Sequence, residues 1–160
     1  MTDGWTSDER ADWAREQGFL DGFATERRTE AETLILRHDG TLGGVQAALD
    51  AHLRSLSPAT GVLVSDATDV LSALTCLVRL GRRVPEDLSL IVGDDEWFLD
   101  HVTPTPARYR VDAGAYARRV SRMALRQAET GALVCRAVRV MPSLVRGDSL
   151  APCASREARA

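Results

Sequence analysis

Two aspartates each follow a short apolar run and are the first candidates for binding chemistry. Asp66 comes two residues after the run 62–64, and Asp94 comes two residues after the run 88–92. Carboxylates at strand ends accept hydrogen bonds from ligand hydroxyl groups, which is how a polar, sugar-like molecule is held. In an open parallel sheet, ligands bind outside the carboxyl ends of the strands. Asp66 and Asp94 are therefore candidate ligand-binding residues, although Asp66 is also placed to cap the helix that follows it.

The other candidate side chains are one arginine, two aromatic residues and two acidic residues. Arg15 lies within an expected helix, where an arginine considered alone is usually solvated or ion-paired. Trp97 and Phe98 follow the second acidic run, so each ring can stack on a ligand or close the core beneath a loop. The core role is the favoured interpretation for Phe98. Asp95 and Glu96 are interpreted as surface or loop-ordering groups.

The sequence gives little support for catalysis, a metal or a cofactor. His38, His52 and His101 have no metal-ligand spacing among themselves or with the three cysteines, so we predict no metal site. Ser65 lacks the G-x-S-x-G surroundings of a hydrolase nucleophile. The run 90–96 is similar to the acidic magnesium pocket of a receiver domain, but too short a segment follows it and the chain has no lysine. We expect no catalytic residue and no cofactor.

The aspartates belong to a β-α-β unit that spans residues 61–96. A short apolar run at 62–64 predicts a strand, and a helical pattern follows it until Gly81. A turn at 84–87 then leads to a second apolar run. The order and length are those of two parallel strands joined by a crossover helix. The carboxyl end of each strand therefore carries an acidic group.

The remaining pattern alternates helices and short strands. It predicts helices at 7–25, 42–56 and 111–130, strands at 33–36, 107–110, 137–140 and 143–145, a turn at 38–40 and a loop at 97–106. Ser57 and Pro58 are expected to stop the second helix, and Gly131 the last. This order indicates an α/β fold, a layered parallel sheet flanked by helices.

Composition sets broad limits on the function. The chain has 160 residues and 44% hydrophobic residues, which suits one domain or a little more than half of a two-domain protein. A net charge of −3 does not favour a broad nucleic-acid surface. The three scattered cysteines indicate a reduced, cytoplasmic protein. No apolar run approaches the roughly 20 residues of a membrane span, and the acidic N-terminus is not a signal peptide.

Four stretches of the sequence resemble the LacI/GalR family of transcriptional regulators. They are L-G-x-x-V-P-E-D-L-S at 80–89, G-D-D at 93–95, T-P at 103–104 and L-V-R-G-x-S-x-A-P at 144–152. The resemblance implies an effector-binding domain of the type I periplasmic-binding-protein-like fold, which senses a sugar or a similar small molecule. It also implies that Arg15, in the R-E-Q-G-F run, contacts the ligand together with Asp66 and Asp94.

The resemblance further implies a partial effector domain. Residues 1–106 would be the C-terminal subdomain less its first strand, 107–131 a segment that crosses to the N-terminal subdomain, 132–152 the returning strands and 153–160 a frayed tail. The helix-turn-helix that binds DNA would precede Met1. The crossing segment would lack its usual partner and expose an apolar face.

We therefore predict a ligand-sensing domain that performs no catalysis and forms a homodimer. Its ligand-binding residues are Arg15, Asp66, Asp94 and Trp97. One alternative is a remnant that only dimerises, which Ala67 and Gly93 favour because they replace family residues beside the two aspartates. The other alternative is a small magnesium-dependent enzyme that uses Asp94 and Asp95.

Overall fold

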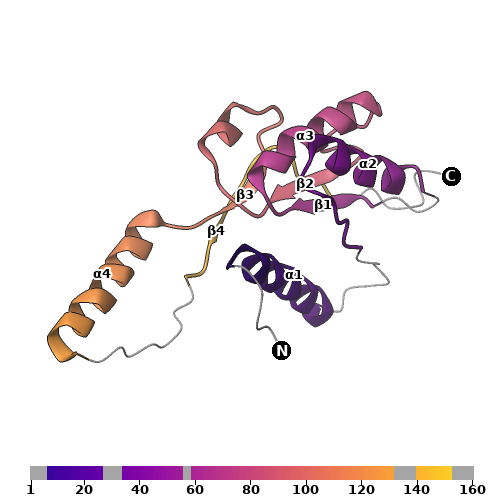
Figure 1. Cartoon of the computed structure of the whole chain (residues 1–160). Coiled ribbons are helices and arrows are strands. Elements are labelled where there is room, and N and C mark those ends of the chain that lie inside the picture. The colour runs from indigo at the N-terminus through magenta and orange to yellow at the C-terminus, as the bar shows by residue number, and fades with distance from the viewer. Residues whose placement is uncertain (1–6, 27–33, 56–58, 132–139, 153–160) are drawn as a thin grey trace. The chain divides into compact units, whose positions relative to one another are not determined.

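The computed structural model describes residues 7–26, 34–55, 59–131 and 140–152 (Figure 1). The chain divides into two compact units, Met1–Pro58 and Ala59–Ala160. Several predicted features lie outside the described residues: the stop at 57–58, the strand residues 137–139 and the tail 153–160. Val140 is described and does not belong to a strand.

The described part of the first unit consists of two helices and the segment between them. Helix α1 spans Ser7–Glu26, which confirms the predicted helix, and helix α2 spans Leu42–Leu53. The side chain of Thr41 caps α2 by accepting a hydrogen bond from the backbone N–H of Gly44 at 3.0 Å. The turn before it is confirmed as well, with Gly40 at a φ of 77°.

Helix α2 is shorter than the predicted helix that ends near residue 56. It ends at Leu53, where the N–H of Arg54 donates to the carbonyl of Asp50 and the Arg54 guanidinium pairs with the Asp50 carboxylate at 2.8 Å. The helix buries one face, made of Val45, Leu49 and Leu53.

The prediction of a strand at 33–36 is wrong for residues 34–36, which the structure describes. Leu34, Ile35 and Leu36 are not in a strand, and the Leu34 side chain is 61% exposed. A strand exists only where its backbone pairs with a neighbour. Among the described residues, the sheet contains four strands and none of them lies in this segment.

The second unit is built on that four-stranded sheet. Its strands are β1 (Gly61–Val64), β2 (Ser89–Val92), β3 (Ala107–Arg110) and β4 (Ser143–Val145), in that spatial order. The first three run parallel, and β4 is antiparallel to β3. The structure thus confirms the central β-α-β unit, the strand at 107–110 and the strand at 143–145.

Helix α3 (Ala67–Arg79) connects β1 to β2 and covers the sheet. Its inner face consists of Ala67, Val70, Ala73, Cys76 and Leu77, all of them buried. The helix closes at Gly81, whose φ of 65° lies in the left-handed region that favours glycine. Ala67 and Val70 pack with Leu90, Val92 and Leu99 in the core cluster.

The segment between β2 and β3 was predicted as an irregular loop, but it contains a short 3₁₀ helix, η1 (Trp97–His101). This turn places Leu99 in the core, where its side chain is fully buried. A single turn is too short to show a helical repeat of apolar residues, so sequence periodicity cannot detect it.

The segment after β4 ties the sheet together through Ser149, which is buried. The Ser149 hydroxyl donates to the carbonyl of Leu90 at 2.5 Å and accepts from the N–H of Ala107 at 2.9 Å, so it joins β2 to β3. Gly147 lets this segment pass close to the start of β3. A Cβ on Gly147 would lie 2.3 Å from the carbonyl oxygen of Thr105.

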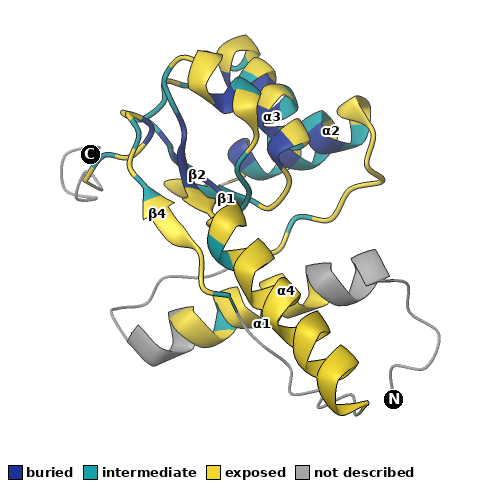
Figure 2. Ribbon diagram, turned by 90° about the vertical axis from the view of Figure 1, so that its left-hand side faces the viewer, coloured by how far each residue is buried: buried dark blue, intermediate teal, exposed yellow. Residues whose placement is uncertain are grey.

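Helix α4 (Ala113–Thr130) follows β3, and none of its residues, all of which are described, is buried (Figure 2). Its apolar side chains recur on one face, including Tyr116, Val120 and Met123, each more than 40% exposed. Helix α4 therefore exposes an apolar face, as expected for the segment 107–131. Within the described residues, no helix combines the length and the apolar character that crossing a membrane requires.

Candidate functional site

The carboxyl ends of β1 and β2 lie side by side. We call this end of the sheet, where Val64 and Val92 finish their strands, the sheet edge. Val64 pairs with Val92, and the N–H of Gly93 donates to the carbonyl of Val64 at 2.8 Å. Gly93 also allows a close approach, because a Cβ there would lie 3.2 Å from the carbonyl oxygen of Ser65. The turns that follow the two strands are therefore in contact, and each of them carries one of the predicted aspartates.

Asp66 caps helix α3, which confirms the capping role that was the alternative for this residue. Its carboxylate accepts a hydrogen bond from the N–H of Thr68 at 2.8 Å and another from the Thr68 hydroxyl at 2.7 Å. Both bonds end on the same oxygen, Oδ1, and the side chain is exposed at the sheet edge. Capping fixes the direction of this carboxylate, and its contact with a ligand stays a prediction.

Asp94 is half-buried at the end of β2. Its Oδ1 accepts a hydrogen bond from the backbone N–H of Asp95 at 2.8 Å. This bond ties the carboxylate to the backbone of the loop that follows β2. The structure thus brings Asp94 to the same edge as Asp66, which agrees with the sequence argument for both positions.

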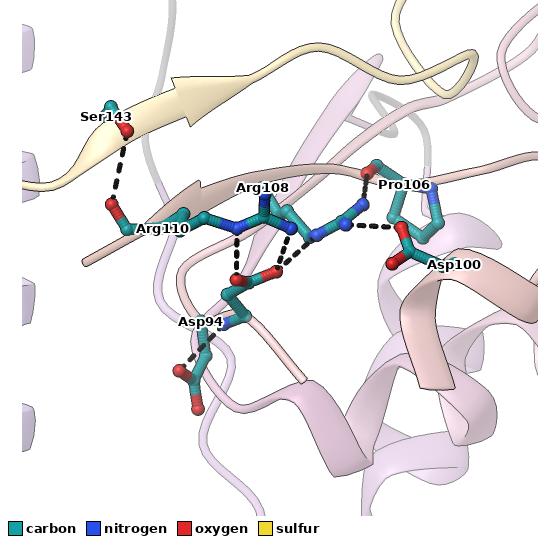
Figure 3. A network of polar contacts seen from close by, with 7 residues as sticks. Asp94, Asp100, Pro106, Arg108, Arg110 and Ser143 are labelled. Carbon is teal, nitrogen blue, oxygen red and sulfur yellow. Dashed lines mark hydrogen bonds and ion pairs between the residues drawn. The ribbon is translucent and has the colours of Figure 1, made fainter. Parts of the chain in front are cut away.

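Asp95 is held between Arg108 and Arg110 of β3, the two arginines labelled in Figure 3. The Nε atoms of Arg108 and Arg110 each lie 2.5 Å from one of its carboxylate oxygens. Arg108 is buried and also donates to Asp100 at 2.5 Å and to the carbonyl of Pro106 at 3.5 Å. The loop-ordering interpretation of Asp95 is therefore confirmed, because its contacts join the β2–η1 loop to β3.

These ion pairs fix the charge of Asp95. The hydrogen bond from Arg110 holds the pKa of the Asp95 carboxyl below its usual range, and the bond from Arg108 acts in the same direction against the effect of burial. The same pairing with Asp95 raises the pKa of Arg110. A magnesium enzyme would need Asp95 as a metal ligand, and an aspartate already bound by two guanidinium groups argues against that alternative.

Sequence reasoning missed the two arginines. A signal for them exists, because Arg108 and Arg110 alternate along a strand and so lie on one face of it. Nothing in the sequence says that this face meets the loop after β2.

The aromatic residues after the aspartates differ in exposure. Trp97 is 75% exposed, and its ring meets those of Phe98 and His101 edge-on, with centroids 6.2 and 6.0 Å apart. Phe98 is half-buried and packs against the core cluster, which confirms its predicted role. Trp97 therefore presents an apolar ring to solvent on the loop that follows Asp94.

Arg15 lies in the middle of α1, in the first unit, and its side chain is exposed. In its neighbour Glu16, both carboxylate oxygens accept a hydrogen bond from Nη2 of Arg37, at 2.9 and 2.8 Å. The structure brings Asp66, Asp94 and the Trp97 loop together in the second unit. The participation of Arg15 in the same site stays a prediction.

The described part of the chain contains no cluster of metal-binding side chains. No three side chains of His, Cys, Asp or Glu gather there in a way that could hold a metal ion. The arrangement at the sheet edge offers carboxylate acceptors and an exposed aromatic ring, which are suited to binding hydroxyl-bearing molecules.

Comparison with solved structures shows the fold of LacI-family regulators. A sugar-binding regulator from Escherichia coli, solved with phosphate, has a TM-score of 0.73 and 20% identity over 92% of this chain and 53% of its own. A regulator from Enterococcus faecium with bound ribose has a TM-score of 0.74 and 18% identity over 91% of this chain and 54% of its own. These values confirm the fold that the resemblance implied.

A third structure, of a transcriptional regulator in complex with cellobiose, has a TM-score of 0.70 and 24% identity. It matches 90% of this chain and 44% of its own. The chain thus spans about half the length of the structures that it resembles. Among curated proteins, no sequence matches it.

The sequence model of the periplasmic-binding-protein-like domain matches residues 4–150, which is most of the chain and includes the whole sheet. The chain belongs to the family of periplasmic-binding-protein-like domains.

Proposed function

We propose that this chain binds a small polyhydroxylated molecule, a sugar or a close chemical relative, without transforming it. The observation that carries the proposal is the contact between the two strand ends. It places Asp66 and Asp94 on adjoining turns at the edge where open α/β sheets bind ligands. Structures of similar fold contain ribose or cellobiose, which supports this ligand class.

Each of the four residues has a distinct role in the proposal. The carboxylates of Asp66 and Asp94 accept hydrogen bonds from ligand hydroxyl groups, and Arg15 donates two bonds to ligand oxygens. The exposed ring of Trp97 packs against the apolar face of the sugar. Binding of this kind needs neither a metal nor a cofactor.

We further propose that the chain acts in the cytoplasm as the effector-binding part of a LacI-type transcriptional regulator and that it forms a homodimer. DNA would be bound by a helix-turn-helix domain outside this chain. In such a regulator the ligand shifts the equilibrium between two conformations that differ in operator affinity. The division into residues 1–106, 107–131 and 132–152 belongs to the same proposal.

A thermal-shift screen tests the binding proposal. The purified chain is melted with ribose, cellobiose, other sugars, nucleosides and Mg²⁺. A ligand at a hundredfold excess over its Kd stabilises the folded state by about 2.7 kcal/mol. We expect a shift with one class of sugar, which Asp94→Ala removes and Glu96→Ala, a change on the same loop, retains. A response to Mg²⁺ alone would contradict the proposal and favour the enzyme alternative.

A second candidate function is dimerisation without a ligand. It is favoured by the exposed apolar face of α4 and by the engagement of Asp66 Oδ1 in capping. Light scattering of the purified chain separates the two candidates when it is combined with the screen. A stable dimer whose melting does not respond to any sugar would support this second function.

A further inference from the structure

We propose that Arg108 and Arg110 fix the direction of the Asp94 carboxylate, although neither of them contacts it. The connection runs through Asp95. Both guanidinium groups bind the Asp95 side chain, with Nε to oxygen distances of 2.5 Å, and the Asp95 backbone N–H binds Asp94 Oδ1 at 2.8 Å. Strand β3 therefore holds Asp95, and Asp95 holds the candidate ligand-binding carboxylate. Figure 3 shows these contacts in sequence.

The contacts of Arg108 make it a positioning residue rather than a ligand-binding one. Its side chain is only 3% exposed, and its guanidinium group donates to Asp95, Asp100 and the carbonyl of Pro106. A ligand at the sheet edge would have to displace one of these bonds. Because Arg108 is buried and already bonded to these three groups, Asp94 and not Arg108 is the residue that contacts the ligand in this proposal.

Arg110 has the same partner but different surroundings. Its side chain is 46% exposed, and it binds Asp95 through two atoms, at 2.5 and 3.3 Å. Arg110 can therefore be changed without opening the core, whereas a change of Arg108 also releases Asp100. A change of Arg110 therefore tests the positioning of Asp94, whereas a change of Arg108 would also lower the stability of the fold.

The charges explain how Asp95 can serve as the anchor for Asp94. Two neighbouring carboxylates repel one another, and two cations beside Asp95 offset that repulsion. Asp95 therefore stays ionised in its place beside the two arginines, and its backbone N–H stays bound to the Asp94 carboxylate. Loss of a hydrogen bond from either arginine to the Asp95 carboxylate is a local change. The resulting change in structure should therefore concentrate at residues 93–97.

The experiment compares Arg110→Met with Arg83→Met as the matched control. Arg83 is an exposed arginine that binds Asp87 through two hydrogen bonds of 3.0 Å, far along the chain from β3. Two NMR readouts are taken without ligand: the hydrogen-exchange rate of the Asp95 amide, and the side-chain couplings of Asp94, which report its χ1 rotamer. A merely structural role of Arg110 would not move the Asp94 rotamer.

In Arg110→Met we expect the exchange rate of the Asp95 amide to rise about tenfold and the Asp94 rotamer to become averaged, because a charge-assisted anchor is lost. Asp95→Asn should give a larger effect and Arg110→Lys a smaller one. Arg83→Met should leave both readouts unchanged. An unchanged Asp94 rotamer in Arg110→Met and Asp95→Asn would overturn the proposal, as would an equal rise in exchange at Ile91 within β2.

The inference rests on the proposed function only for what Asp94 binds. A titration with D-ribose, monitored at the same amides, is the separate arm. If the wild-type chain binds ribose, Arg110→Met should weaken that binding several-fold and Arg83→Met should not. If the wild-type chain binds no sugar, the proposed function fails, and the ligand-free readouts still decide whether the arginines position Asp94.

Discussion

Replacement of Ser149 by alanine should destabilise the second unit strongly, even though it removes a single oxygen atom. The Ser149 hydroxyl is buried and links two neighbouring strands, because it accepts from the N–H of Ala107 and donates to the carbonyl of Leu90. In Ser149→Ala the Ala107 N–H loses this acceptor in a place that water does not reach.

The magnitude follows from those two bonds. An unsatisfied buried donor costs about 1–3 kcal/mol, whereas a carbonyl has two lone pairs and loses less. We therefore expect Ser149→Ala to lower the free energy of unfolding by about 2–3 kcal/mol. Ser89 is half-buried and bonds Ala151 at 3.2 and 3.1 Å, so Ser89→Ala should cost about 1 kcal/mol.

Ser143 provides the matched control. It is exposed, and its hydroxyl donates to the carbonyl of Arg110 at 3.3 Å, so Ser143→Ala should change the free energy by less than about 0.5 kcal/mol. Urea denaturation followed by circular dichroism gives all three values. The midpoint for Ser149→Ala should fall by about 1 M or more. Equal midpoints for Ser149→Ala and Ser143→Ala would refute the reasoning from burial.

Three other predictions follow from the same structure. Because the folded-state pKa of Asp95 is lowered, its ionised form stabilises the fold above the unfolded pKa of about 4, and that contribution is lost as the pH falls through the folded value. The difference in urea midpoint between wild type and Asp95→Asn should therefore be largest near pH 7 and shrink below about pH 4; a difference independent of pH would contradict the ion pairing. Gly147→Ala should abolish the cooperative melt seen by circular dichroism, because the added Cβ would lie 2.3 Å from the Thr105 carbonyl, and a normal melt would disprove that close contact. Val120→Ser on α4 should shift the urea midpoint by an amount equivalent to less than about 0.5 kcal/mol, because the side chain is 47% exposed in the isolated chain; a large loss would mean that this face is covered.

The sequence was sufficient for the second unit where its signals are local. Apolar runs bounded by turn residues located β1 and β2, and the apolar face of α3 between Asp66 and Gly81 located the crossover helix. These elements follow from periodicity and from capping residues, which depend on near neighbours in the chain. The positions of Asp66 and Asp94 at one edge follow from them.

The remaining features depend on partners that are distant in the chain. The apolar run at 33–36 is typical of a strand, yet its described residues form none, because a strand needs a paired neighbour; Leu34 and Ile35 are exposed. The single turn η1 depends on the burial of Leu99 in the core. The ion pair between Arg108 and Asp95 depends on the packing of β3 beside the β2–η1 loop. Neither contact has a local sequence signal.

Chemical-shift mapping with a sugar tests the central claim most directly. The labelled chain is titrated with the sugar that gives the largest thermal shift, or with D-ribose, and the amide resonances are followed. We predict that the perturbed amides concentrate at residues 65–67 and 93–97, with Arg15 also affected, and that Asp94→Ala removes the response. Perturbations that avoid both strand ends, or a wild-type chain that responds to no sugar at millimolar concentration, would contradict the account.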